Sequence, residues 1–259
     1  MIQTRKYVTR GWAFLGGLLA LLLAVSAHAQ VSQEFHRTVS LPANGRVSLD
    51  NINGNVEITG WNRNEVQIDA VKQARDQQRL EEARIEVESG SDYVRIHTQY
   101  PHDHANNNPA SANYTLHVPQ NARIESISLV NGSLIVEKMM AEVDAKLVNG
   151  KAHIRDLSGE ANISSVNGSI EANYASLNNV REIKLKSVNG SIELGLPGSP
   201  NAEVKASTVN GSIKTDFPLT VQGAFSGHSL SGTLGSGGTR IELSNVNGSM
   251  HIGSAREGL

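Results

Sequence analysis

Short stretches of the chain alternate between apolar and polar residues, and turn-forming residues separate these stretches. Residues 182–186 read Glu-Ile-Lys-Leu-Lys and residues 192–196 read Ile-Glu-Leu-Gly-Leu, with an Asn-Gly pair between them. Residues 143–147 and 152–154 follow the same alternation. A period of two sends successive side chains to opposite faces of a strand. The pattern therefore predicts short β-strands, each with one buried face and one solvated face.

The turn between these strands repeats almost the same phrase along the chain. With small changes, the phrase VNGSI stands at 52–56, 130–134, 148–152, 166–170, 188–192, 209–213 and 246–250. From Asn131 onward the Asn-Gly pairs recur at steps of 18, 18, 22, 21 and 37 residues. Self-similarity at about 20 residues is the signature of a repeat architecture. The last step is close to two ordinary steps, so Ser231-Gly232 is expected to form the missing corner.

Each repeat is predicted to contain two strands and two corners. Asn-Gly tolerates positive φ and suits a tight turn, and a second turn is expected midway, as at 157–159. The predicted corner residues are Asn131, Gly132, Asn149, Gly150, Asn167, Gly168, Asn189, Gly190, Asn210, Gly211, Asn247 and Gly248.

Two architectures fit this pattern. In a meander, Asn-Gly closes a hairpin and Leu185 lies opposite Leu194. In a β-solenoid, each strand pairs in parallel with its copy about 20 residues later. A hairpin needs only Asn-Gly, whereas a stack repeats the whole phrase, so the sequence favours an all-β solenoid of single-stranded β-helix type. It predicts three columns of stacked residues, namely Val166, Val188 and Val209, Asn167, Asn189 and Asn210, and the interior Ile170, Ile192 and Ile213.

The segment before the main repeats is organised differently. Two strands around a turn are expected over 46–61, a third over 65–71 and a short helix over 76–83, and further strands follow around 85–87, 92–100 and 113–119. An open coil end is an unpaired sheet edge that needs a cover. We therefore assign 30–120 to a small β-rich N-terminal cap and 121–259 to the solenoid repeats.

The first 29 residues have the pattern of a signal peptide. Arg5, Lys6 and Arg10 form a basic segment, residues 11–26 are apolar, and Ala27-His28-Ala29 is a small-x-small cleavage site. The alternative is an uncleaved membrane anchor, but the apolar run is short for a span of about 20 residues. We expect cleavage after Ala29, no membrane span in the mature chain, and a periplasmic or extracellular protein.

Charge and cysteine content narrow the classes of function. The full chain carries 23 Lys and Arg against 25 Asp and Glu, and the signal peptide holds three of the basic residues and no acidic one, which leaves a net charge of −5. Nucleic-acid binding requires a basic face, so no nucleic-acid partner is expected. The chain has no cysteine, so burial and backbone pairing must hold the fold without disulfides.

The repeated units, led in by NINGNVEITGW at 51–61 and YTLHVP at 114–119, resemble the bacterial putative-adhesin domain family. The resemblance covers about residues 35–255. It implies a stack of β-solenoid type in an exported or envelope protein of unknown function. It supplies no catalytic residues.

One cluster could hold a metal ion. His102, Asp103 and His104 lie close to His97, and His117 on the next predicted strand could join them. Histidine and carboxylate ligands suit first-row metals, but a site needs ligands that are held firmly. We interpret the polar segment at 101–113 as a solvated loop and expect no metal and no cofactor.

Other candidate chemistry is weak. The NGS phrases, together with Asn113 and Asn162, match the N-glycosylation sequon, yet the turn explains the Asn-Gly spacing without a sugar. The Gly-rich stretch 226–240 lacks the lysine of a phosphate loop.

After residue 120 the aspartates are Asp144, Asp156 and Asp216, each near the end of a different coil. This distribution is unlike the clustered acids of polysaccharide-cleaving enzymes.

We therefore expect an exported, non-catalytic β-repeat protein that serves as a scaffold or adhesin-like binding module. Its expected partner is a protein or a glycan of the cell envelope. The alternative is a regulatory or sensing protein of envelope stress that binds another envelope component. An enzyme acting on polysaccharide is a more distant alternative.

Overall fold

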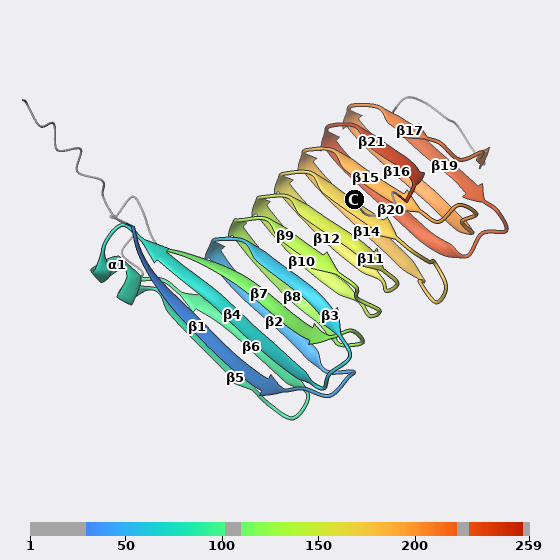
Figure 1. Cartoon of the computed structure of the whole chain (residues 1–259). Helices are drawn as coiled ribbons and strands as arrows, with labels where there is room; N and C mark the ends of the chain where they lie inside the picture. The colour runs from blue at the N-terminus through green and yellow to red at the C-terminus, as the bar shows by residue number, and fades with distance from the viewer. Residues whose placement is uncertain (1–29, 102–109, 222–227, 256–259) are drawn as a thin grey trace, which may run out of the picture.

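The computed structural model describes residues 30–101, 110–221 and 228–255. The described chain is almost entirely β-structure, arranged as one 10-stranded and one 11-stranded sheet. The two sheets enclose a continuous hydrophobic core, and the strands form an elongated stack with β1 to β7 at one end (Figure 1).

Within each sheet, the spatial order of the strands differs from their order along the chain. The 10-stranded sheet contains, in spatial order, β1 (Val31–Ser40), β4 (Glu65–Ala74), β7 (Ser111–Pro119), β3 (Val56–Trp61), β9 (Leu134–Glu137), β11 (Ala152–Leu157), β13 (Ile170–Tyr174), β15 (Ile192–Leu196), β21 (Met250–Ser254) and β17 (Ile213–Thr215). The 11-stranded sheet contains β18 (Thr220–Val221), β19 (Ser229–Leu234), β16 (Ala202–Asn210), β20 (Thr239–Asn247), β14 (Glu182–Asn189), β12 (Ala161–Asn167), β10 (Val143–Asn149), β8 (Arg123–Asn131), β2 (Arg46–Asn53), β6 (Tyr93–Gln99) and β5 (Arg84–Ser89).

Successive Asn-Gly units pair in parallel and in register. In the 11-stranded sheet Leu185 pairs with Ile163 on one side and with Leu243 on the other. In the 10-stranded sheet Ile192 pairs with Ile170. Leu185 and Leu194 therefore lie in different sheets and are not strand partners, which rules out the hairpin arrangement for these units.

Antiparallel pairs occur at both ends of the stack, so both sheets are mixed. At the N-terminal end β4 pairs with β1 and β7, and β5 pairs with β6. At the other end β19 pairs with β16 and β18. These hairpin-like additions differ from the uniform parallel coils that the repeat alone predicts.

The last repeat does not lie where the chain order predicts. Strands β20 and β21 insert between β14–β15 and β16–β17, so Asn247 lies between Asn189 and Asn210. Met250 likewise separates Ile192 from Ile213. The predicted direct contacts of Val188, Asn189 and Ile192 with their copies 21 residues later are therefore wrong.

The expectation that Ser231-Gly232 forms a missing corner is also wrong. Both residues lie inside β19, where Ser231 pairs with Lys205 and Gly232 pairs with Val204 in antiparallel register. The long step of 37 residues thus contains a returning strand instead of an extra coil. This strand carries the chain back so that β20 can enter the stack.

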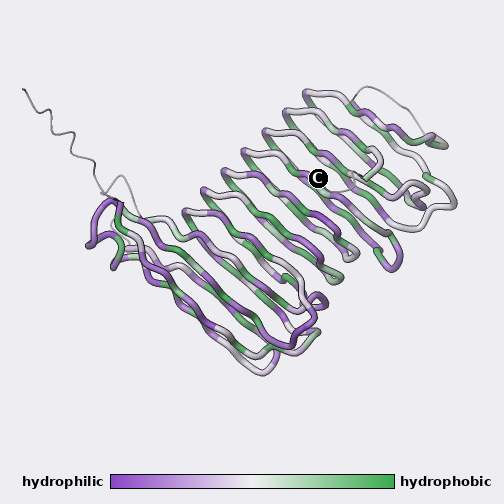
Figure 2. Tube along the Cα trace, viewed as in Figure 1, coloured by the Kyte–Doolittle hydropathy of each residue, from purple (hydrophilic) through white to green (hydrophobic). Residues whose placement is uncertain are grey.

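The core is built from columns of aliphatic side chains that point inward from both sheets. The column through Ile170 continues to Ile192, Met250 and Ile213, and these side chains are all buried. Hydrophobic and hydrophilic residues alternate along many of the stacked strands in Figure 2, as they do along β16. The period-two pattern of the sequence is thus the inside–outside pattern of the fold.

Glycine is required at the corners because successive corners approach closely. A Cβ at Gly190 would collide with the carbonyl oxygen of Gly168, and the backbone nitrogen of Gly190 donates to the carbonyl of Asn247 at 3.1 Å. Positive φ occurs only at Gly54 and Gly248 among the described corner glycines. The predicted conformational reason for glycine is therefore wrong at most corners, and the reason is steric.

The N-terminal region contains the short helix that the sequence predicts. Helix α1 spans Gln77–Glu82, and the side chain of Asp76 caps it by accepting from the backbone nitrogen of Arg79 at 2.9 Å. Buried Lys72 donates from Nζ to the carbonyls of Leu80 and Ala83 at 3.0 and 2.7 Å. A single lysine therefore fixes the C-terminal end of the helix on β4.

Within residues 30–101, 110–221 and 228–255, no helix has the length and apolar character needed to cross a membrane.

Candidate functional site

The Asn-Gly corners form one long edge of the stack. The asparagine amides bond to one another there, with each Nδ2 donating to the Oδ1 of the previous corner at 2.8–2.9 Å. In spatial order the ladder runs through Asn53, Asn131, Asn149, Asn167, Asn189, Asn247 and Asn210. The ladder stabilises the edge and holds its corners in line.

A row of aliphatic side chains accompanies this ladder and faces solvent. Val166 is 42% exposed and Val188 is 39% exposed. The equivalent residues that are also exposed are Ile52, Val148, Val246 and Val209. The valine of the repeated phrase is therefore an outward residue, in contrast to the buried isoleucine that follows the corner.

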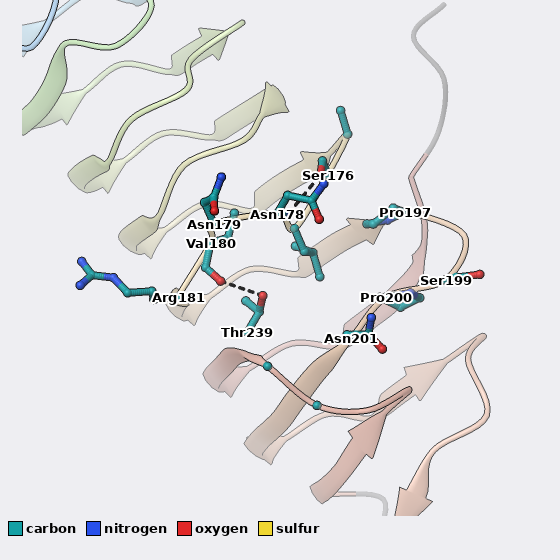
Figure 3. A pocket seen from close by; sticks show the side chains of 14 residues that line it. Ser176, Asn178, Asn179, Val180, Arg181, Pro197, Ser199, Pro200, Asn201 and Thr239 are labelled. Atoms are coloured by element: carbon teal, nitrogen blue, oxygen red, sulfur yellow. Dashed lines mark hydrogen bonds between the residues drawn. The ribbon is translucent and has the colours of Figure 1, made fainter.

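The opposite edge of the stack is irregular and is hollowed into grooves. One groove of about 590 Å³ lies between the β13–β14 connection and the loops at 197–201 and 237–239. A neighbouring groove of about 610 Å³ lies between the same connection and the corners at 140–142 and 158–160. The connection at 175–181 therefore forms a ridge with a groove on each side, and Figure 3 shows the first of them.

Several contacts fix this ridge. Ser176 Oγ accepts from the backbone nitrogen of Asn178 at 3.1 Å, and Asn179 adopts a left-handed conformation with φ 66°. At the end of the ridge, buried Thr239 donates its hydroxyl to the carbonyl of Val180 at 2.8 Å, as Figure 3 shows. The exposed amides of the ridge are thus held on an anchored loop.

Arg181 stands where the grooves meet. It lines both of them and a third, smaller groove of about 510 Å³. Its Nε donates to Glu160 at 2.6 Å, while its side chain is 87% exposed. This hydrogen bond raises the pKa of the guanidinium, which is charged at any physiological pH.

The structure separates the members of the candidate metal cluster that it describes. His102, Asp103 and His104 lie outside the described residues. His97 belongs to β6 in one sheet, and His117 belongs to β7 in the other, where its ring stacks on Trp61 at 5.3 Å. Across the described parts of the chain, no group of three or more histidine or acidic residues is arranged to hold a metal ion.

The three aspartates after residue 120 occupy separate places. Asp144 accepts from Asn162 at 2.6 Å, and Asp216 accepts from His251 at 3.0 Å. Asp156 lies near the end of β11 and has a positive φ of 51°. Asp144 lies in the 11-stranded sheet and Asp156 in the 10-stranded sheet, so these two carboxylates project from different sheets.

Sequence reasoning did not find the grooves. A signal was present, because the step from Asn167 to Asn189 is 22 residues whereas the two preceding steps are 18. The additional residues fall in the connection at 175–181, which forms the ridge. Unequal steps in a repeat thus mark the loops that project from a regular edge.

The fold and these surfaces define a β-repeat protein with one regular edge and one grooved edge. The chain belongs to the Toastrack DUF4097 family, whose model matches residues 52–253. No curated protein matches the chain.

Several solved structures are similar to the chain. A putative cell adhesion protein from Clostridium sporogenes is 16% identical with a TM-score of 0.53, over 86% of this chain and 100% of that one. A putative adhesin from Bacteroides fragilis is 15% identical with a TM-score of 0.43, over 86% of this chain and 97% of that one. At this identity the first likeness concerns the fold alone.

Proposed function

We propose that the protein is an exported, non-catalytic β-solenoid that serves as an adhesin-like binding scaffold of the cell envelope. Its partner is a protein or a glycan of the envelope. The observation that carries this proposal is the in-register stacking of seven Asn-Gly corners, because it holds exposed side chains at a constant spacing along a rigid axis.

Further support comes from the family and from the first solved structure, which is called a putative cell adhesion protein. A rigid stack loses little conformational entropy when it binds, so most of the interaction energy of each contact is retained. An extended array also allows several weak contacts to act together. Both properties suit a scaffold that binds a polymeric or surface-bound partner.

Sedimentation with isolated cell envelopes tests this function. The protein purified from its native host should sediment with envelopes. Retention after protease treatment of the envelopes would identify a glycan partner, and loss would identify a protein. Failure to sediment with untreated envelopes would overturn the proposed function.

Export has its own test. The basic and apolar pattern of residues 1–29 predicts that the protein isolated from its host begins at Gln30. Intact-mass spectrometry measures this directly. An N-terminus at Met1 would contradict cleavage and would favour the alternative of an uncleaved membrane anchor.

A further inference from the structure

We propose that the two grooves beside the 175–181 ridge bind a glycan chain of low net charge. This assignment rests on the proposed function and names the ligand class and the site. The grooves lie on the irregular edge of the stack, and they share Ser176, Asn178, Asn179 and Arg181 in their linings.

Unpaired amides are the first reason for a glycan. The side-chain amides of Asn121, Asn178 and Asn179 are exposed and make no hydrogen bond to other residues in the part of the chain that the structure describes. An amide offers donors and an acceptor in one plane. Sugar hydroxyl groups both donate and accept, so an amide can bind two neighbouring hydroxyls at once.

Arg181 adds fixed donors at the same place. Its bond to Glu160 uses Nε, which leaves the terminal amino groups of the guanidinium for a ligand. The guanidinium plane has a defined orientation because Glu160 accepts a hydrogen bond from its Nε. Arg181 therefore offers directed hydrogen bonds to ring or hydroxyl oxygens in either groove.

The first groove also has an apolar part. Leu177, Pro197 and Pro200 line it next to the polar ridge. A sugar ring carries hydroxyls at its rim and C–H groups on its faces, so it needs polar and apolar contacts side by side. Ligand sites typically combine apolar lining with a few oriented polar groups.

The charge of the groove lining favours a neutral glycan over a charged polymer. The charged residues that line the two grooves are Arg123, Arg181, Glu142 and Glu160, so the positive and negative charges cancel. A polyanion requires an excess of basic residues, so the lining favours a neutral chain.

An extended peptide is disfavoured by backbone pairing. β10, β12 and β14 lie beside the grooves and are each paired on both sides. They therefore have no free edge to which a peptide could add as a strand.

Binding of the full mature protein to a glycan array tests the inference. The array should carry neutral hexose oligosaccharides, N-acetylated oligosaccharides and uronic-acid oligosaccharides, with extended peptides printed beside them. The protein should bind neutral or N-acetylated chains. Preference for uronic-acid chains or for peptides would overturn the assignment.

Variants locate the site. Asn178→Ala combined with Asn179→Gly removes both amides and keeps a residue that tolerates positive φ at 179. Loss of two hydrogen bonds should weaken binding about tenfold or more. Arg181→Lys should also weaken binding, because it keeps the charge and loses the planar fork.

Asn64→Ala is the matched control, since it removes an amide on the β3–β4 connection, outside the grooves. It should leave binding unchanged, and melting temperatures should show that all variants fold. Equal binding by the ridge variants and the unaltered protein would overturn the inference but leave the proposed function. The same conclusion would follow if the protein bound nothing on the array and still sedimented with envelopes after their glycans had been digested.

Discussion

At the scale of single residues, the corners combine close packing with specific hydrogen bonds. The Asn side chains bond to one another, and at the corners of Asn167, Asn189, Asn210 and Asn247 the polar side chain two residues before the Asn bonds to the carbonyl of a neighbouring corner. Ser187 Oγ donates to the carbonyl of Gly168 at 3.1 Å, and Asn245 Nδ2 donates to that of Gly190 at 2.7 Å. The Asn-Gly pair therefore recurs because the Asn side chain bonds to the neighbouring corner and the Gly leaves room for its backbone.

Replacing Gly190 with Ala should destabilise the protein strongly. The new Cβ would collide with the carbonyl of Gly168, and backbone cannot move aside as a flexible side chain can. We expect a loss of about 2–4 kcal/mol in the free energy of unfolding, in the range of overpacked core sites or above. Denaturant unfolding measures this, and Ser191→Ala is the control with a small effect. A Gly190→Ala protein as stable as the control would contradict the steric explanation.

Two buried tyrosines should respond differently to the loss of their hydroxyls. Tyr114 Oη is 2.6 Å from Thr98 Oγ1, and both side chains are buried. Tyr174 Oη is buried without a hydrogen-bond partner in the described structure. Tyr114→Phe should cost about 1–3 kcal/mol because it leaves Thr98 unpaired.

Tyr174→Phe should leave the stability unchanged or raise it, because no bond is lost and a buried unpaired polar group is removed. Thermal unfolding of both variants under one set of conditions provides the comparison. A larger loss for Tyr174→Phe than for Tyr114→Phe would show that the Tyr174 hydroxyl has a partner.

At the scale of elements, the sequence predicts strands well because buried and solvated positions alternate along most of them, as in β4 and β16. The two strands around the turn at 46–61 and the helix at 76–83 are present as β2, β3 and α1. Parallel pairing of the Asn-Gly units also follows from the repeated phrase.

The order of the last elements could not be predicted. Ile183, Ile241 and Val204 occupy one column, and each is aliphatic, so β14 could accept either β20 or β16 as its neighbour. The order along the chain suggests β16, the nearer copy in sequence, whereas the neighbour of β14 is β20. The grooves were missed for a related reason, since a pattern of buried positions carries no information on how a loop such as 175–181 projects.

The interior columns predict unequal costs for two adjacent residues of β15. Ile192 is fully buried between Ile170 and Met250, whereas Glu193 points to solvent. Ile192→Ala should cost about 2–5 kcal/mol in unfolding free energy, and Glu193→Ala should cost less than about 0.5 kcal/mol. Urea titration of both variants measures the difference. Similar costs would contradict the assignment of inward and outward faces.

At the scale of the whole molecule, the stack is closed by strands that depart from the chain order at both ends. β2 and β3 lie between the later strands β6–β7 and β8–β9, and β20–β21 lie between β14–β15 and β16–β17. The terminal additions are antiparallel, and they pair with the outermost parallel strands. Such covers limit the exposed sheet edge that would otherwise pair with other chains.

Engineered disulfides can test the position of the last repeat, since the natural chain contains no cysteine. Val188 and Val246 lie on neighbouring strands, about 4.8 Å apart at their α-carbons, which is within the span of a disulfide. Val188 and Val209 are separated by β20 and lie about 10 Å apart. The pair Val188→Cys and Val246→Cys should therefore form an intramolecular bond on mild oxidation, whereas Val188→Cys and Val209→Cys should stay reduced.

Peptide mass spectrometry after oxidation identifies the bonded pair, and Val166→Cys with Val188→Cys is the positive control because β12 and β14 are neighbours. Oxidation at low protein concentration keeps bonds between molecules from forming. The outcome distinguishes two spatial orders of the repeats, with either β20 or β16 beside β14. Both orders would bury the same aliphatic side chains. Efficient bonding of the 188–209 pair would place β16 directly beside β14, as the chain order alone suggests, and would remove β20 from the interior of the stack.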